Sequence, residues 1–148
     1  MSETKQISLT LEPRFWDRPP EISVIMDHAI VWTNTVAKTI TVEFHCQLAM
    51  YESHCLLVHR QGKTLDQTNQ SLGQDQLLLI KQLLIDKTDV GDLLYTHSEF
   101  EPEYPEPWAS QQCEPLPKII TGETVLGHNG TWRFAFTSPF YKFLFDTV

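Results

Sequence analysis

The segment 54–86, HCLLVHRQGKTLDQTNQSLGQDQLLLIKQLLID, holds two apolar runs on either side of a polar loop. Apolar runs of this length have to be buried, whereas the loop between them has to be solvated. Residues 54–60 read as a strand. For residues 75–86 a helix is an alternative, because some apolar positions follow helical spacing and leucine is a good helix former. Lys81 interrupts the alternation of a strand, but the short, strand-like neighbours favour one long, bulged strand.

Strand patterns continue on both sides of this segment. They cover residues 6–12, 21–26, 29–33, 38–46 and 131–137. Asp27 and His28 are predicted to form the turn of a short hairpin. Many short strands separated by turn signals predict an all-β protein, an antiparallel β-sandwich of the jelly-roll type. We expect residues 1–148 to form a single domain, large enough to build a core without staples.

Composition excludes several classes of function. The formal net charge is −8, from 11 basic and 19 acidic residues, so nucleic acid is not an expected partner, because phosphate binding needs clustered Lys and Arg. No run approaches about 18 apolar residues, so membrane insertion is not expected. The start, MSETKQISLT, has no apolar signal-peptide core, and we expect synthesis in a cytoplasm. Three cysteines, an odd number, argue against a disulfide framework.

Two segments are candidates for contacts with a partner. Residues 99–117 hold five prolines and are predicted to form an extended loop, since proline cannot donate to a sheet ladder. Loops of this length are often functional. The C-terminal segment 138–148 is dense in aromatic residues. Exposed aromatic residues anchor interfaces, although those in the loops would equally suit lids over the core edge. The candidate ligand- or partner-binding residues are Trp16, Tyr104, Trp108, Phe140, Tyr141 and Phe143.

The polar loop between the two apolar runs is a candidate site for a hard cation. Calcium takes about six to eight oxygen ligands, and Asp66, Asn69 and Asp75 flank this loop. The alternative is that Asp66 and Asn69 make local turns with the backbone and that Asp75 only begins a strand.

Other site chemistries are weakly supported. The sequence has no HExxH or CxxC motif. Two adjacent residues on a strand point to opposite faces and cannot easily bind the same ion, so a transition-metal site is not expected. Motifs for a catalytic nucleophile or a phosphate loop are also absent from the sequence. We therefore expect no enzymatic activity. The alternative is a pair of carboxylates of the kind that hydrolyses glycosides, whose spacing is decided only in three dimensions.

A family resemblance runs through residues 22–91. The sequence PPEISVIMDHAIV is similar to a strand–turn–strand opening, HCLLVHR follows as a strand, and DQLLLIKQLLID is an Asp-led strand. In this order they resemble the calcium-dependent xylan-binding modules, which are small jelly-roll sandwiches. His28 stands where glycine usually closes the turn, and the Asn-Asp pair of that family's loop is absent. The resemblance implies a carbohydrate-binding fold, with Asp75 and Asp66 as the calcium ligands.

A second resemblance covers most of the chain. A KTxDQT loop, an ExxPxYP segment, the turn LGHNGTW and the ending PFYKFLF resemble small proteins encoded by tailed phages of cyanobacteria and other marine bacteria. It implies a non-enzymatic virion structural protein, tail-associated or capsid-decorating, which assembles in the host cytoplasm with other virion proteins into an oligomer. The alternative function is a carbohydrate-binding module that recognises host-surface polysaccharide. Calcium is the only cofactor considered, and it is expected only if the chain is a carbohydrate-binding module.

Overall fold

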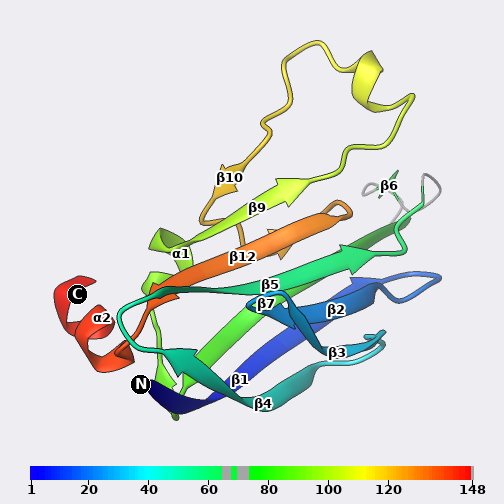
Figure 1. Cartoon of the computed structure of the whole chain (residues 1–148). Helices are drawn as coiled ribbons and strands as arrows, with labels where there is room; N and C mark the ends of the chain where they lie inside the picture. Colours follow the sequence, from blue (N-terminus) through cyan, green and yellow to red (C-terminus); the bar gives the residue numbers. More distant parts are fainter. Residues whose placement is uncertain (65–67, 70–73, 148) are drawn as a thin grey trace.

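The computed structural model describes residues 1–64, 68–69 and 74–147, and it shows two antiparallel sheets packed against each other (Figure 1). One sheet has the order β11-β7-β1-β4, with β6 and β8 also paired to β7, and the other has the order β10-β9-β12-β5-β2-β3. This arrangement confirms the predicted antiparallel β-sandwich. The strands are β1 (Ser2–Phe15), β2 (Glu21–Met26), β3 (Ala29–Thr35), β4 (Ile40–Ala49), β5 (Ser53–Gln61), β6 (Thr68–Asn69), β7 (Gln74–Ile85), β8 (Thr88–Asp89), β9 (Ser98–Pro102), β10 (Ile120–Thr121), β11 (Val125–Leu126) and β12 (Gly130–Thr137), and the helices are α1 (Leu93–Thr96), η3 (Ala109–Gln111) and α2 (Phe140–Thr147).

The core lies between the two sheets and follows directly from the alternation in the sequence. On β1 every second residue from Ile7 to Leu11 is fully buried, because successive side chains of a strand point to opposite faces. On β12 the same rule buries Trp132, Phe134 and Phe136. Burying one large apolar side chain contributes roughly 1.5–3 kcal/mol, so each of these inward residues stabilises the sandwich.

The ambiguous segment 75–86 is a strand, and the helical alternative is wrong. Strand β7 pairs with β1 along most of its length, and the register shifts between Thr10 and Leu11. Thr10 faces Gln82 and Leu11 faces Ile80, which leaves Lys81 as the extra residue of a bulge. The bulge resolves the broken alternation, because it turns Lys81 to solvent while the apolar residues on both sides of it stay in the core.

The hairpin between β2 and β3 turns at Asp27 and His28, as predicted. Both residues have positive φ, 45° and 73°, which is what a two-residue hairpin turn of type I′ requires. The Asp27 carboxylate accepts a hydrogen bond from the backbone N–H of Cys55 at 3.0 Å and contacts Nδ1 of His54 at 2.5 Å. These contacts fix the hairpin onto β5.

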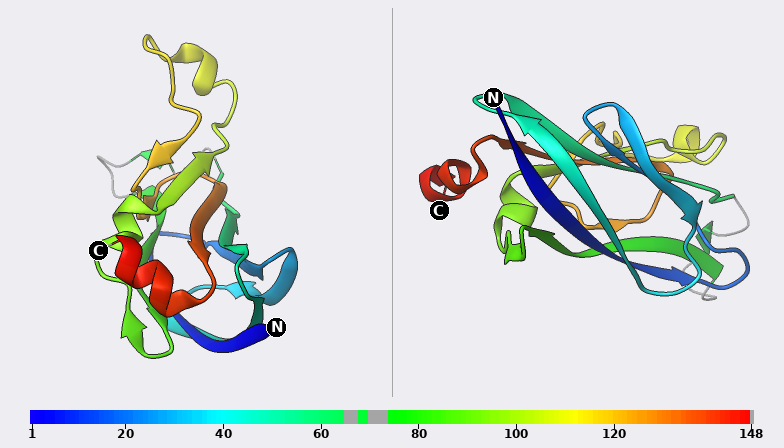
Figure 2. Two further views of the ribbon diagram at one scale, coloured as in Figure 1. Left: turned by 60° about the vertical axis from the view of Figure 1, so that its left-hand side comes forward. Right: turned by 60° about the horizontal axis from the view of Figure 1, so that its bottom comes forward.

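The loop predicted for residues 99–117 begins later in the chain than the sequence indicated. Its first residues belong to β9, which pairs with β12 on one side and with β10 on the other. Pro102 stands at the last position of that strand, where a missing N–H is tolerated. The remaining segment, residues 103–119, contains the single turn η3 and extends away from the sandwich (Figures 1 and 2). We call residues 103–119 the Pro-rich arm.

The aromatic C-terminal segment folds into the helix α2 beside one end of the sandwich (Figure 2). Phe140 and Phe143 are only 3% and 7% exposed, and their rings pack against those of Phe134 and Phe136. They complete the core, which corrects the expectation that they contact a ligand or partner. Tyr141 lies on the exposed face of the helix. In the described part of the chain, no helix has the length and apolar character needed to cross a membrane.

Candidate functional site

Several loops that are distant in sequence meet at one end of the sandwich. A hydrogen bond of 2.6 Å joins Arg18, in the loop between β1 and β2, to Thr64, which follows β5. Asn129, in the turn between β11 and β12, bonds to the backbone of Lys63. The Pro-rich arm leaves β9 at the same end (Figure 1). We call this region the loop end and define it as residues 16–20, 61–64, 75–76, 103–108 and 126–129.

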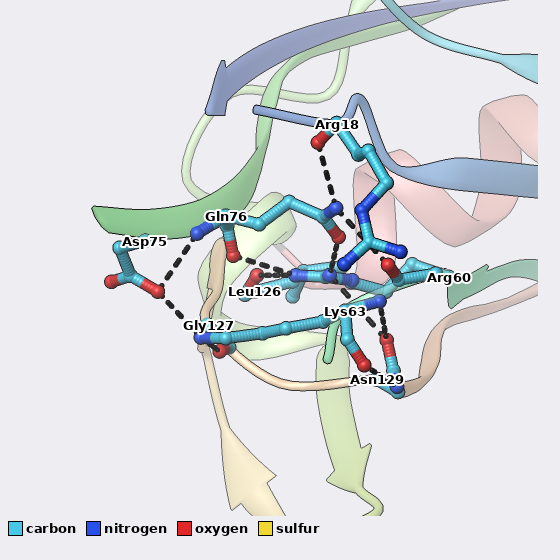
Figure 3. A network of polar contacts seen from close by, with 9 residues as sticks. Arg18, Arg60, Lys63, Asp75, Gln76, Leu126, Gly127 and Asn129 are labelled. Atoms are coloured by element: carbon cyan, nitrogen blue, oxygen red, sulfur yellow. Dashed lines mark hydrogen bonds and ion pairs between the residues drawn. The ribbon is translucent and has the colours of Figure 1, made fainter. Parts of the chain in front are cut away.

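Lys63 is the centre of a polar network at the loop end (Figure 3). Its Nζ lies 2.6 Å from Oδ1 of Asp75 and 2.5 Å from the carbonyl oxygen of Gly127. The side chains of Lys63 and Asp75 are 8% and 12% exposed. Burial lowers the pKa of Lys63, and the Asp75 carboxylate acts in the opposite direction. The two side chains therefore form an ion pair that is largely shielded from water.

The backbone of Lys63 is fixed as firmly as its side chain. The side-chain amide of Asn129 accepts a hydrogen bond from the N–H of Lys63 and donates one to its carbonyl oxygen, both at 3.0 Å. This reciprocal pair joins the segment after β5 to the turn between β11 and β12. Asn129 therefore fixes the backbone of Lys63, which lies beyond the end of β5, to this turn.

Arg60 belongs to the same network, and its side chain is fully buried. Its guanidinium donates to the carbonyl oxygens of Gln76 at 3.1 Å and Leu126 at 2.7 Å, and also to the side-chain oxygen of Gln76. Gln76 in turn donates to the carbonyl of Arg18 at 2.8 Å (Figure 3). Burial lowers the pKa of Arg60 to about 10, so the group stays charged at neutral pH. These bonds connect β5, β7, the loop between β1 and β2 and the turn between β11 and β12.

Three half-buried rings pack together beside this network. The ring centroids of Tyr104 and Trp108 are 6.1 Å apart, and both rings contact the imidazole of His128, at 4.9 and 5.3 Å. The Tyr104 hydroxyl donates to the carbonyl of Pro117 at 2.6 Å and closes the base of the Pro-rich arm. Burial and the charges of Lys63 and Arg60 lower the pKa of His128, so its imidazole is neutral at pH 7. We call Tyr104, Trp108 and His128 the aromatic cluster.

A small pocket opens between the aromatic cluster and the Lys63 network. Its volume is about 20 Å³, enough for one water-sized group. The residues that line it are Lys63, Thr64, Glu103, Pro105, His128 and Asn129. They present amide, hydroxyl, carboxylate and imidazole groups to a space that fits a single hydroxyl.

A wider hollow lies next to the pocket, on the outer face of the sheet that contains β2, β3 and β5. Its volume is about 520 Å³, and its lining is Glu21, Ile22, Ser23, Thr33, Asn34, Thr35, His59 and Gln61. Gln61 connects the two spaces, because its amide donates to Glu103 at 2.8 Å and contacts the imidazole of His59 at 3.0 Å. A row of polar side chains therefore leads from the pocket onto the sheet face.

The structure separates the predicted site residues into groups. Tyr104 and Trp108 lie together in the aromatic cluster. Trp16 lies in the loop between β1 and β2, is 45% exposed and is not one of the three rings of that cluster. Asp75 is at the loop end, paired with Lys63. Asp66 lies outside the described residues. Among the residues that the structure does describe, no group of three or more His, Cys, Asp or Glu side chains is placed to hold a metal ion.

Sequence reasoning did not single out Arg60, Gln76, Asn129 or His128. Arg60 carried a usable signal, because it shares the inward parity of Leu56 and Val58 on β5. A charged residue in the core register of a strand has to find buried partners. The other three carried no comparable signal, since their roles depend on which loops meet at the loop end.

Comparisons with known proteins place the fold. No family model and no curated protein matches the sequence. One similar solved structure is the module vCBM60, described in connection with a circular permutation that links two families of calcium-dependent carbohydrate-binding modules. Its TM-score is 0.52, and the two sequences are 12% identical over 88% of this chain and 89% of that chain. Another is vCBM60 in complex with galactobiose, with a TM-score of 0.50 and 14% identity over 87% and 96% of the two chains. At these identities the similarity concerns the fold alone.

Neither similar structure is described as a phage or virion protein. The expected virion role, its oligomeric assembly and its location in the particle therefore stay predictions.

Proposed function

We propose that this chain is a non-catalytic carbohydrate-binding module whose binding site is the loop end. The observation that carries the proposal is the stacked pair Tyr104 and Trp108 beside a pocket that fits one hydroxyl. The fold that the chain shares with a module solved in complex with galactobiose supports the same conclusion.

The chemistry of a sugar matches this combination of groups. A pyranose ring has apolar C–H faces and a rim of hydroxyls, so it needs a flat apolar surface next to directed polar groups, as ligand sites in general do. The exposed parts of Tyr104 and Trp108 supply the flat surface. One hydroxyl enters the pocket, where Asn129 and Glu103 are in reach. The neutral imidazole of His128 can donate at one nitrogen and accept at the other.

Rigidity of the loop end favours binding as well. Ordering flexible side chains on association costs about 0.5–1.5 kcal/mol for each of them. Here Lys63, Asn129 and Arg60 are already fixed by hydrogen bonds within the protein. A ligand therefore meets a site that needs little rearrangement.

The polar row towards the hollow sets the expected ligand size. Gln61 and His59 continue from Glu103 onto the sheet face, and the hollow of about 520 Å³ is within the usual range for small-molecule sites, about 300–1,000 Å³. We therefore propose an oligosaccharide or a segment of a polysaccharide, with one residue at the aromatic cluster and the following residues over the hollow.

A glycan array with the wild-type chain and two variants tests this proposal. Trp108→Ala removes a central ring of the aromatic cluster, and Tyr51→Ala is the matched control, because Tyr51 is an exposed ring outside the loop end. We expect wild type and Tyr51→Ala to bind the same glycans, and Trp108→Ala to bind them about 30-fold more weakly, as for a loss near 2 kcal/mol at a binding hot spot. No glycan binding by the wild type, with or without calcium, would overturn the proposal.

A further inference from the structure

Calcium is implied for this chain by its structural neighbours, which belong to calcium-dependent modules. The predicted calcium ligand in the described residues is Asp75. Its Oδ1 already accepts two hydrogen bonds, from Nζ of Lys63 at 2.6 Å and from the backbone N–H of Gln76 at 2.8 Å. The carbonyl of Gly127, a second oxygen of the kind calcium prefers, also accepts from Lys63. Both oxygens are engaged by the same ammonium group.

The charge at this place also disfavours a divalent cation. Two buried or nearly buried cations, Arg60 and Lys63, face the single carboxylate of Asp75 in the described network. The two cations influence each other, since the charge of Arg60 contributes to the lowered pKa of Lys63. Like charges repel strongly where water is excluded. A calcium ion at Asp75 would have to displace the Lys63 ammonium and then remain close to the Arg60 guanidinium.

Lys63 holds the loop end together in the way that a structural metal ion would. Its ammonium joins the segment after β5, the start of β7 and the turn between β11 and β12 through Asp75 and Gly127, as Figure 3 shows. An ammonium offers three donors and needs no metal. The described residues therefore do not fit calcium at this place, and they fit an internal cation well.

We propose that the Lys63 ammonium replaces calcium as the cation that orders the loop end, so that the stability of this chain is independent of calcium. Where the proposed carbohydrate function holds, on which this second part rests, sugar binding is independent of calcium too. The two parts have separate measurements, because melting temperature requires no glycan.

Thermal unfolding and calorimetric titration test the first part. The wild-type chain is melted in 5 mM EGTA and in about 5 mM CaCl₂, and CaCl₂ is titrated into the EGTA-treated, dialysed protein. We expect melting temperatures that agree within about 1 °C and no heat of calcium binding. A calcium-dependent rise of more than about 3 °C, reversed by EGTA, or a saturable binding heat would overturn the proposal.

Two variants test the role of Lys63 itself. Lys63→Met leaves a carboxylate without its buried cation, and we expect its melting temperature to fall by at least about 5 °C. Lys142→Met is the matched control, because Lys142 also pairs with a carboxylate, that of Asp146 at 2.7 Å, but on an exposed helix surface. We expect it to melt within about 1 °C of wild type. If Lys63→Met melted like the control, Lys63 would not be the ordering cation.

Glycan binding in EGTA tests the second part. Equal array signals in calcium and in EGTA are expected, and signals that need calcium would overturn the second part. The absence of all glycan signals would overturn the proposed function alone, because the first part is decided by the melting and titration data.

Discussion

Gly130→Ala should disrupt the junction between the loop end and the core. Gly130 has a φ of +151°, and a Cβ at this position would lie 2.3 Å from the carbonyl oxygen of Glu101 and 2.9 Å from Cα of Pro102. Both are backbone atoms of β9, which pairs with β12 at this point, so no side chain can rotate to make room. Backbone strain of about 1–3 kcal/mol adds to an overpacking cost of about 1–3 kcal/mol. The sum is about 2–6 kcal/mol, and we expect a loss of about 3 kcal/mol of unfolding free energy.

Urea denaturation followed by tryptophan fluorescence measures this loss. With a slope of about 2 kcal/mol per molar urea, the midpoint should fall by about 1.5 M. Gly127→Ala is the control in the same turn, because its Cβ would meet only a side-chain carbon of Leu77, at 3.6 Å, and it should shift the midpoint by less than about 0.3 M. A Gly130→Ala midpoint equal to that of wild type, or an equal fall in Gly127→Ala, would refute the steric argument.

Two further predictions concern α2 and the β2–β3 hairpin. Phe143→Ala should cost about 3–5 kcal/mol of unfolding free energy, because the Phe143 ring is buried. Phe145 lies on the exposed face of the same helix, so Phe145→Ala should change the unfolding free energy by less than about 0.5 kcal/mol. Equal losses for the two variants in denaturation would contradict the packing of α2. Burial works against the charged form of His54, but its hydrogen bonds with Asp27 and the Ala49 carbonyl prevail and raise its pKa. The stability it contributes is therefore complete below about pH 6.5 and lost as pH rises through the raised pKa. The free energy of unfolding lost in His54→Gln should be larger at pH 5.5 than at pH 9, and a pH-independent loss would argue against the charged pair.

The fold was largely accessible from the sequence because strands obey a simple alternation. The alternation over residues 6–12 and 131–137 predicted both segments as strands. The interruption at Lys81 in the alternation of β7 corresponds to the bulge that the structure shows. The C-terminal segment was harder. Its aromatic residues indicated contact with something, but only the helix α2 decides that Phe140 and Phe143 contact the core of the same chain.

The candidate site was only partly accessible from the sequence, for a physical reason. Tyr104 and Trp108 were recognisable as loop aromatics, yet their partner His128 comes from a turn about 20 residues further along the chain. The role of Asp75 depended on whether a cation was supplied by the solvent or by the protein. In the structure the ammonium of Lys63 contacts Asp75, and no sequence pattern specifies this pairing.

The most direct measurement of the central claim is a titration of the isotope-labelled chain with the glycan that gives the strongest array signal, followed through its tryptophan indole N–H resonances. The chain has four tryptophans, and Trp132 is fully buried in the core. If sugar binds at the aromatic cluster, the Trp108 resonance shifts in a saturable manner while that of Trp132 stays in place. A Trp108 resonance that does not move at saturating glycan would contradict a binding site at the loop end.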